Sequence, residues 1–360
     1  MFGVYVHIPY CRTRCPYCDF VSEAVAGAPP DAYLDALCAE INAFQGPVRA
    51  DTLFVGGGTP SLLSPAGLER LMEALRVRFS FSPDAEITME ANPDDITPEL
   101  PEQWRALGVN RVSLGVQSLD DRVLRHLGRR HDADGARRAA AHVAAVFENW
   151  NMDLIFGGRP ADAWTATLRE AVSMRPAHVA AYGLTHEPGT PFGGRAGEAL
   201  EDDALLALYQ EAEAALAGYD HYEISNYALR GRECRHNLIY WQNGEYAGFG
   251  TGAYSFVDDV RARNLPDSRE YMRRPGEKGE ALALDAHEIR LETVIQHMRL
   301  RRGLSRRNYL DRFGVPVDAD FGAALDALAR RGLLVNDGDM VRPTAEGFYL
   351  NNEIGLALVG

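Results

Sequence analysis

The stretch that decides the fold is Tyr5-Val-His-Ile-Pro-Tyr-Cys-Arg-Thr-Arg-Cys-Pro-Tyr-Cys18. Its apolar, β-branched start predicts a first strand at residues 4–8, and the loop that follows carries Cys11, Cys15 and Cys18. Three thiolates on one short loop can ligate three irons of a 4Fe-4S cluster and leave the fourth iron open to chelate a substrate. The residues alone leave two alternatives: a zinc site, which needs a fourth Cys or His ligand nearby, and a redox pair, which needs only Cys-x2-Cys.

The composition indicates a globular protein with a full core. The chain has 360 residues, of which 46% are hydrophobic, and this length suits one large domain plus a smaller one. No apolar run approaches the ~20 residues of a membrane span, and the first residues lack the basic region and apolar core of a signal peptide. Five cysteines, an odd number, fit a reducing compartment. We therefore expect a soluble, cytoplasmic protein without a stable membrane span.

The charge balance argues against nucleic acid as a partner. The formal net charge is -14, whereas a surface that neutralises phosphates needs clustered Lys and Arg. Two short basic stretches, around Arg129 and around Arg301, are typical of solvated helix faces.

Up to about residue 185, short apolar runs alternate with helical patterns, as in βα units around a parallel sheet. The predicted strands lie at residues 4–8, 52–55, 86–90, 111–114, 152–156 and 179–184. Ser64 with Pro65, and Thr97 with Pro98, are helix-start signals. Six such units are fewer than the eight of a complete barrel, so we expect an α/β fold with a partial (β/α)6 TIM-like barrel. Chemistry in such barrels lies at the carboxyl ends of the strands.

The remaining chain changes character twice. An amphipathic helix near 203–216 precedes a Tyr-rich and Gly-rich region. From about residue 286, helices and a hairpin around Asn336-Asp337-Gly338 suggest a small winged-helix-like α+β domain. We therefore divide the chain into residues 1–200, the barrel with the cluster; 201–280, a connecting region; and 281–360, the C-terminal domain.

Two further motifs carry potential chemistry. The turn Gly57-Gly58-Thr59 lets backbone N–H groups approach a ligand closely, although a purely structural turn is an equal alternative. His236-Asn-Leu-Ile-Tyr240-Trp241 offers an imidazole with two aromatic rings one turn away, which suits a flat macrocycle and its iron. On residue types alone, a hydrogen-bonded core histidine with two core aromatics is the more common arrangement.

Several motifs together resemble one known family. They are Tyr5-Val-His-Ile-Pro-Tyr-Cys11, Gly57-Gly58-Thr59-Pro60, Glu90-Ala-Asn-Pro93, Leu114-Gly-Val-Gln117, Leu127-Gly-Arg129, Asp153-Leu-Ile, Glu223-Ile-Ser-Asn-Tyr227 and His236-Asn-x2-Tyr240-Trp241. This set resembles the oxygen-independent coproporphyrinogen III oxidase group of radical S-adenosylmethionine (SAM) proteins, and most of all its HemW-type heme chaperone branch. The resemblance runs almost from end to end.

The resemblance implies a cofactor arrangement. The open iron would bind SAM, and reduction of the cluster by an electron donor would cleave SAM to methionine and a 5′-deoxyadenosyl radical. It implies that Tyr5, Glu90 and the turn of Gly57, Gly58 and Thr59 contact SAM. By the same resemblance, Tyr17, Gln117, Arg129 and Asp153 match positions that contact a second SAM in the oxidases, and His236 belongs to a heme motif. Each of these residues also has a plain structural alternative. Arg129 can be a surface helix residue, Gln117 can form a hydrogen bond at a strand end, and Asp153 can cap a helix.

Two departures from the oxidases favour the chaperone branch. The oxidases have a further cysteine shortly after the third ligand, whereas Asp19, Phe20 and Val21 follow Cys18 here. They also carry a long segment before the first strand. We therefore expect a protein that binds heme and delivers it to acceptor hemoproteins. Decarboxylation of coproporphyrinogen III is the alternative, and a SAM-dependent methyltransferase is a third.

The sequence also departs from the chaperones. Tyr254 stands where the relatives usually have His, and Arg159 stands where Leu is usual. Cys38 and Cys234 lie outside the cysteine loop, and Cys234 is an accessory thiolate at most.

Overall fold

The computed structural model describes residues 1–359, and its centre is a twelve-stranded mixed sheet. The strand order is β14-β13-β12-β11-β1-β4-β5-β6-β7-β8-β10-β9. The first six strands of the barrel are β1 (Gly3–Ile8), β4 (Arg49–Gly57), β5 (Ser80–Ala91), β6 (Arg111–Gln117), β7 (Trp150–Phe156) and β8 (His178–Gly183). Neighbouring members of this set pair in parallel, so the predicted partial barrel is confirmed.

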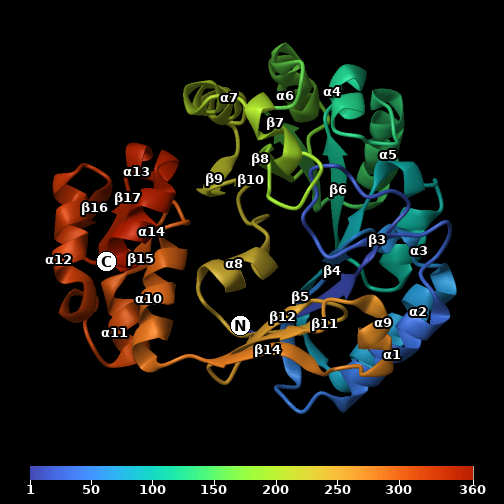
Figure 1. The fold of residues 1–360 in the computed structure, drawn as a ribbon, viewed down its shortest axis with the longest axis horizontal. Coiled ribbons are helices and arrows are strands. Elements are labelled where there is room, and N and C mark those ends of the chain that lie inside the picture. Colours follow the sequence, from blue (N-terminus) through green and yellow to red (C-terminus); the bar gives the residue numbers. More distant parts are fainter. Residues whose placement is uncertain (360) are drawn as a thin grey trace.

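Helices cover the outer face of this curved sheet (Figure 1). They are α1 (Asp31–Ala43), α2 (Pro65–Arg78), α3 (Leu100–Ala106), α4 (Asp121–His126), α5 (Ala133–Val146), α6 (Trp164–Ser173) and α7 (Asp202–Ala215). The hydroxyl of Ser64 accepts a hydrogen bond from the N–H of Gly67, as the predicted start of α2 requires. The predicted start at Thr97 was wrong, because α3 begins at Leu100 after Glu99.

Residues 201–280 extend both edges of the sheet. β11 (Tyr246–Phe249) adds a parallel strand beside β1, followed by the antiparallel β12 (Tyr254–Val257), β13 (Val260–Asn264) and β14 (Lys278–Ala283). At the other edge lie β10 (Asn226–Ala228) and β9 (Asp220–Glu223). The short helix α8 (Arg235–Trp241) lies between these two edges (Figure 1). The division at residues 200 and 280 stays a prediction.

The strands alternate between an apolar outer face and a polar inner face. On β6, Val112, Leu114 and Val116 are fully buried beneath the helices. The alternate residues Arg111 and Ser113 point into the barrel, where they line a cavity. Because side chains on a strand alternate with a period of two, the same backbone builds the core on one face and a polar interior on the other.

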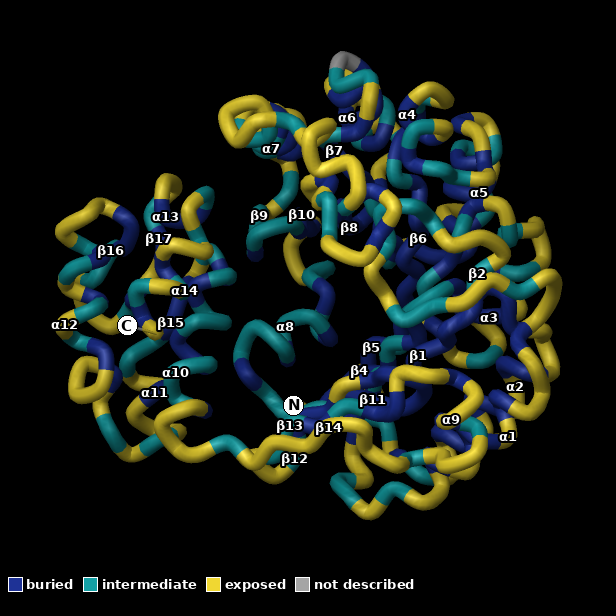
Figure 2. The backbone as a smooth tube through the Cα atoms, viewed as in Figure 1, coloured by how far each residue is buried: buried dark blue, intermediate teal, exposed yellow. Residues whose placement is uncertain are grey.

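The C-terminal part forms a compact unit with its own core, seen on the left of Figures 1 and 2. Its elements are α10 (Ala286–His297), β15 (Leu304–Ser305), α11 (Arg306–Phe313), α12 (Val317–Arg330), β16 (Leu334–Asp337), β17 (Met340–Pro343), α13 (Ala345–Tyr349) and α14 (Asn351–Val359). The order helix, strand, two helices and hairpin is the predicted winged-helix-like arrangement. Gly338, with φ of +58°, turns the hairpin. No helix among residues 1–359 is long and apolar enough to span a membrane.

Candidate cofactor site inside the barrel

The cysteine loop lies over the carboxyl ends of the barrel strands. Cys11 ends the short strand β2 (Tyr10–Cys11), which pairs with β3 (Glu23–Ala24), and Cys15 and Cys18 lie in the loop between them. All three thiols are free, partly exposed and line one cavity of about 630 Å³. Burial raises the pKa of the Cys18 thiol to about 11 and also raises that of Cys11. Within residues 1–359 no group of three His, Cys, Asp or Glu side chains is arranged to hold a metal ion. The spacing of the three cysteines, their free thiols and the cavity that they line fit a cluster.

Arg129 lies directly beneath the cysteine loop. One guanidinium nitrogen, Nη1, donates to Cys15 Sγ at 3.3 Å and to the Tyr17 hydroxyl at 3.4 Å. The other, Nη2, donates to Asn92 Oδ1 at 2.5 Å and to the Gly115 carbonyl at 3.0 Å. The expectation of a solvated helix face was therefore wrong for Arg129. Burial opposes its charge, but the neighbouring Tyr17 and Cys15 raise its pKa, so a fixed cation faces the thiols.

The glycine turn packs closely under the loop. Gly57 has φ of +111°, and a Cβ there would lie 2.5 Å from His7 Nδ1. A Cβ on Gly58 would lie 2.8 Å from the Ile8 carbonyl. The amide of Gly57 donates to Glu90 Oε2 at 2.9 Å, and that of Gly58 donates to the Ile8 carbonyl at 2.8 Å. Both N–H groups therefore donate to acceptors within the protein and are not free to bind a ligand. The two glycines allow the backbone of the turn to pack closely against its neighbours.

Thr59 joins the turn to the cluster loop. Its hydroxyl donates to Cys11 Sγ at 3.3 Å and accepts from Asn92 Nδ2 at 2.9 Å. Asn92 in turn holds Arg129. The turn, the β5 end and Arg129 therefore form one hydrogen-bonded frame around the thiols.

Two carboxyl groups face the interior from β5 and β7. Burial raises the pKa of Glu90 to about 8, and repulsion from Asp153 adds to the shift. Burial also raises the pKa of Asp153, which accepts hydrogen bonds from Asn151 at 2.7 Å and Ser113 at 3.2 Å. Two acidic groups in one low-dielectric chamber favour the neutral form of at least one of them.

Gln117 has the backbone conformation of a strained site. Its φ is +66°, in the left-handed region that non-glycine residues rarely adopt, at the last position of β6. Gln117 lines the same cavity as the cysteines, together with Tyr17, Gly57, Gly58, Thr59, Glu90, Arg129 and Asp153. The structure therefore brings these predicted residues together at the carboxyl ends of the strands.

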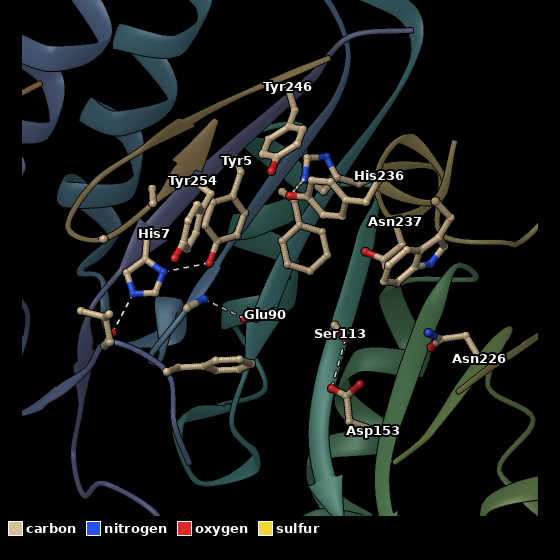
Figure 3. A pocket seen from close by; sticks show the side chains of 18 of the residues that line it. Tyr5, His7, Glu90, Ser113, Asp153, Asn226, His236, Asn237, Tyr246 and Tyr254 are labelled. Carbon is tan, nitrogen blue, oxygen red and sulfur yellow. Dashed lines mark hydrogen bonds between the residues drawn. The ribbon is translucent and has the colours of Figure 1, made fainter. Parts of the chain in front are cut away.

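A second cavity, of about 740 Å³, lies deeper in the barrel: Arg111 and His178, the first residues of β6 and β8, line it, and so does Gln296 of the C-terminal unit. Aromatic side chains from several elements line it: Tyr5, Phe54, Tyr182, Tyr240, Trp241, Tyr246 and Tyr254. Figure 3 shows Tyr5, Tyr246 and His236 on one side and Asp153 and Asn226 on the other. Residues of the two cavities overlap at Asp19, Phe20, Gly57, Glu90, Ser113, Asp153 and Tyr182. The two chambers therefore share a wall.

Tyr5 and His236 belong to this second chamber and are absent from the lining of the cysteine cavity. The Tyr5 hydroxyl is 2.9 Å from His7 Nδ1 (Figure 3). His236 is fully buried on α8 and stacks on Phe54. Its Nδ1 is 2.7 Å from the Thr52 hydroxyl and its Nε2 is 2.8 Å from the Tyr240 hydroxyl. Burial lowers the pKa of His236 to about 3, so the ring is neutral.

Sequence reasoning missed the residue that holds α8 in place. Glu86, buried on β5, accepts hydrogen bonds from the backbone N–H groups of Arg235 and His236, each at 3.1 Å. A carboxylate at a helix N-terminus is stabilised by the N–H groups that have no partner within the helix. The alternation Glu86-Ile-Thr88-Met-Glu90 placed three polar side chains on one face of the strand, which was the available signal.

The positions that depart from the resembled family lie at the edges of the site. Tyr254 is 45% exposed, and the Arg263 guanidinium lies 5.1 Å from its ring centroid. Arg159 is exposed and donates to the Glu198 carbonyl. Cys234 is buried with Sγ 3.6 Å from Glu86, and burial raises its pKa to about 12, which makes it a neutral thiol. Cys38 is buried in α1, away from both cavities.

Comparisons with known proteins agree with this architecture. A family model of the Radical SAM superfamily matches residues 5–171, and one of the HemN C-terminal domain matches residues 284–350. Heme chaperone HemW of Escherichia coli K12 is 35% identical over 99% of this chain and 98% of its own. Heme chaperone HemW of Mycobacterium tuberculosis H37Rv is 38% identical over 100% of this chain and 95% of its own.

A solved structure is similar over nearly the whole chain. The Escherichia coli coproporphyrinogen III oxidase HemN, described as a radical SAM enzyme, superimposes with a TM-score of 0.86 at 26% identity, over 99% of this chain and 89% of that one. The lower sequence identity to the oxidase and the higher identity to the chaperones agree with the motif comparison. The chain therefore belongs to the radical SAM superfamily and, within it, to the HemW family.

Proposed function

We propose that this protein is a radical SAM heme chaperone, which binds heme and delivers it to acceptor hemoproteins. The observation that carries the proposal is the pair of adjoining chambers in a chain similar over its full length to the HemW chaperones: one lined by three free thiols, the other by aromatic rings around His236. We place its action in the cytoplasm, where reducing conditions preserve free thiols.

The first chamber suits a 4Fe-4S cluster and SAM. Cys11, Cys15 and Cys18 would ligate the cluster, and Arg129 would offset the negative charge of the thiolates. When bound, the cluster supplies the electron for cleavage of SAM, taken from an external donor. Glu90, Gln117 and the glycine turn would orient SAM, with Tyr17 and Asp153 completing the wall. Tyr5 would act from the adjoining chamber, through the shared wall.

The second chamber suits heme. Its aromatic side chains offer flat apolar faces, and neutral His236 is in the protonation state that ligates iron. The Tyr240 hydroxyl is hydrogen-bonded to Nε2 of His236, so it must move away before that nitrogen can ligate iron. The hydrogen bond between Nδ1 and the Thr52 hydroxyl fixes the orientation of the ring.

The heme assignment is tested by titration. Anaerobically reconstituted protein should bind heme, and His236→Ala should weaken the binding at least tenfold. Thr52→Val should weaken it less, because the ring keeps Nε2 and loses only its orienting partner. Equal heme affinity of wild type and His236→Ala would contradict the role of His236 as a ligand.

The oxidase remains the second candidate function, because its solved structure shares the fold over 99% of this chain. The oxidases have a further cysteine shortly after the third ligand, but this chain has Asp19, Phe20 and Val21 there. Phe20 is 59% exposed and lines both cavities. We expect incubation with coproporphyrinogen III, SAM and a reductant to yield no protoporphyrinogen. Formation of that product would support the oxidase instead, and S-adenosylhomocysteine would indicate a methyltransferase.

A further inference from the structure

Arg111 is a buried cation without a partner in the protein. It begins β6, is 2% exposed and lines the 740 Å³ cavity. Among residues 1–359 its Nε has no hydrogen-bond partner, and no carboxylate forms an ion pair with its guanidinium. An unpaired buried charge is costly, so such a group is retained where a ligand of opposite charge completes it.

The neighbouring acidic groups are engaged elsewhere. Asp153 accepts from Asn151 and Ser113, and Glu86 holds the first N–H groups of α8. Burial opposes the charge of Arg111, but the acidic groups around it attract that charge at longer range, and its pKa is raised. Arg111 therefore remains charged, and its guanidinium is free to bind an anion inside the cavity.

The sheet register places Arg111 near the histidine motif. Thr52 on β4 is paired with Glu86 on β5, and Thr88 on β5 is paired with Arg111 on β6. Thr52 is the residue that holds His236 Nδ1. Neighbouring strands are about 4.8 Å apart, and the two pairs are offset by two residues, about 6.6 Å along the strand, so the backbones of Thr52 and Arg111 are about 12 Å apart. A flat ligand with a ring system on His236 and an acidic substituent at its edge can span this distance.

We propose that Arg111 binds a carboxylate of the ligand in the barrel cavity, and that this carboxylate is a propionate of heme. The inference rests on the proposed function, because it takes heme as the occupant. A guanidinium matches a carboxylate with two parallel hydrogen bonds, which would fix the orientation of the macrocycle as well as its position. The carboxylate of SAM has the same chemistry, so the experiment must separate the two sources.

The test compares Arg111→Met with wild type for two ligands: heme, and its dimethyl ester, in which the propionates carry no charge. We expect Arg111→Met to weaken heme binding at least tenfold, as the loss of a charged hydrogen bond implies. It should change binding of the dimethyl ester less than twofold, and Arg111→Lys should restore part of the heme affinity. Arg137→Met, which removes an arginine already paired with Glu170 outside the cavity, is the matched control and should leave both affinities unchanged.

Thermal unfolding of the heme-free protein distinguishes recognition from a structural role. Replacing an unpaired buried cation by Met should leave the Tm unchanged or raise it. A lower Tm with unchanged heme affinity would overturn the inference and leave the chaperone proposal standing. Loss of SAM binding with heme binding intact would assign Arg111 to the SAM carboxylate and also overturn it. If wild type binds no heme, the proposed function itself fails.

Discussion

At the scale of single residues, the barrel interior is a chamber of ionisable groups with altered protonation. Glu90 and Asp153 both have raised pKa values because burial penalises their charged forms. Arg111 and Arg129 keep their charge near them. Such clusters are typical of functional sites, where charge is arranged for a ligand rather than for stability.

Glu90 makes the stability of the protein depend on pH. Its pKa is about 8 in the folded protein and about 4.3 in an unfolded chain, so between these values the folded state holds a proton that the unfolded state has lost. This contribution to stability is complete below pH 4 and disappears as the pH rises through 8. Glu90→Gln does not titrate, so its stability relative to wild type should increase by about 1–2 kcal/mol between pH 5 and pH 8.5.

Thermal unfolding of the SAM-free protein across that pH range measures this effect. The expected change in stability is smaller than the full pKa shift would give. Glu90 lines a cavity of about 630 Å³, where water can screen its charge. Glu73→Gln on the exposed face of α2 is the control for loss of a surface carboxylate. A difference between Glu90→Gln and wild type that stays constant with pH would contradict the buried, protonated state of Glu90.

Cys15 tests the cluster site. Cys15→Ala removes one of three thiolates as well as the thiol that Arg129 contacts, so reconstituted protein should lose most of its iron, sulfide and cluster absorbance. Cys38→Ala, at a buried free cysteine of α1, should retain all three signals. Full cluster content in Cys15→Ala would refute the assignment.

At the scale of elements, the histidine motif depends on a cap from another strand. Cys234, the residue before α8, makes no side-chain capping hydrogen bond to the helix, and Glu86 on β5 supplies the acceptors instead. Helix α8 has only seven residues, so it has little stability of its own and takes its position from this contact.

Glu86→Ala should therefore destabilise the protein and misplace His236. Removing two charge-assisted acceptors should cost about 2–3 kcal/mol in urea unfolding and lower the heme affinity, with the cluster content unchanged. The matched control is Asp285→Ala, which removes the capping box of α10 and should lower the stability without changing heme affinity. An unchanged heme affinity in Glu86→Ala would show that α8 is positioned without this cap.

Local patterns predicted the elements whose signals lie within a few residues. The strands of the barrel and the start of α2 follow from alternation and from Ser64 with Pro65. The strands between residues 220 and 283 were missed, because they are short and are stabilised by pairing with distant strands such as β1 and β8. The hydrogen-bond partners of His236 could not be predicted from local sequence patterns, because Thr52 and Glu86 lie more than a hundred residues away in the chain.

At the scale of the whole molecule, the C-terminal unit packs against the segment that follows α8 and reaches the second cavity. Arg312 on α11 donates to the carbonyls of Gln242 and Asn243, directly after α8, and the Asn243 side chain donates to the Ile289 carbonyl on α10. Gln296 on α10 lines the deep cavity. The winged-helix-like unit is therefore part of the chamber wall, consistent with a role in packing or partner contact in this acidic chain.

A protein that carries heme for other proteins must release it to them, so heme transfer to an acceptor tests the proposed function. Reconstituted protein loaded with heme is mixed anaerobically with an apo-hemoprotein, and the heme spectrum of each partner is followed after separation. We predict that heme moves to the acceptor and that the acceptor gains its own heme spectrum. Heme that stays on this protein, with the acceptor left without heme, would contradict the account.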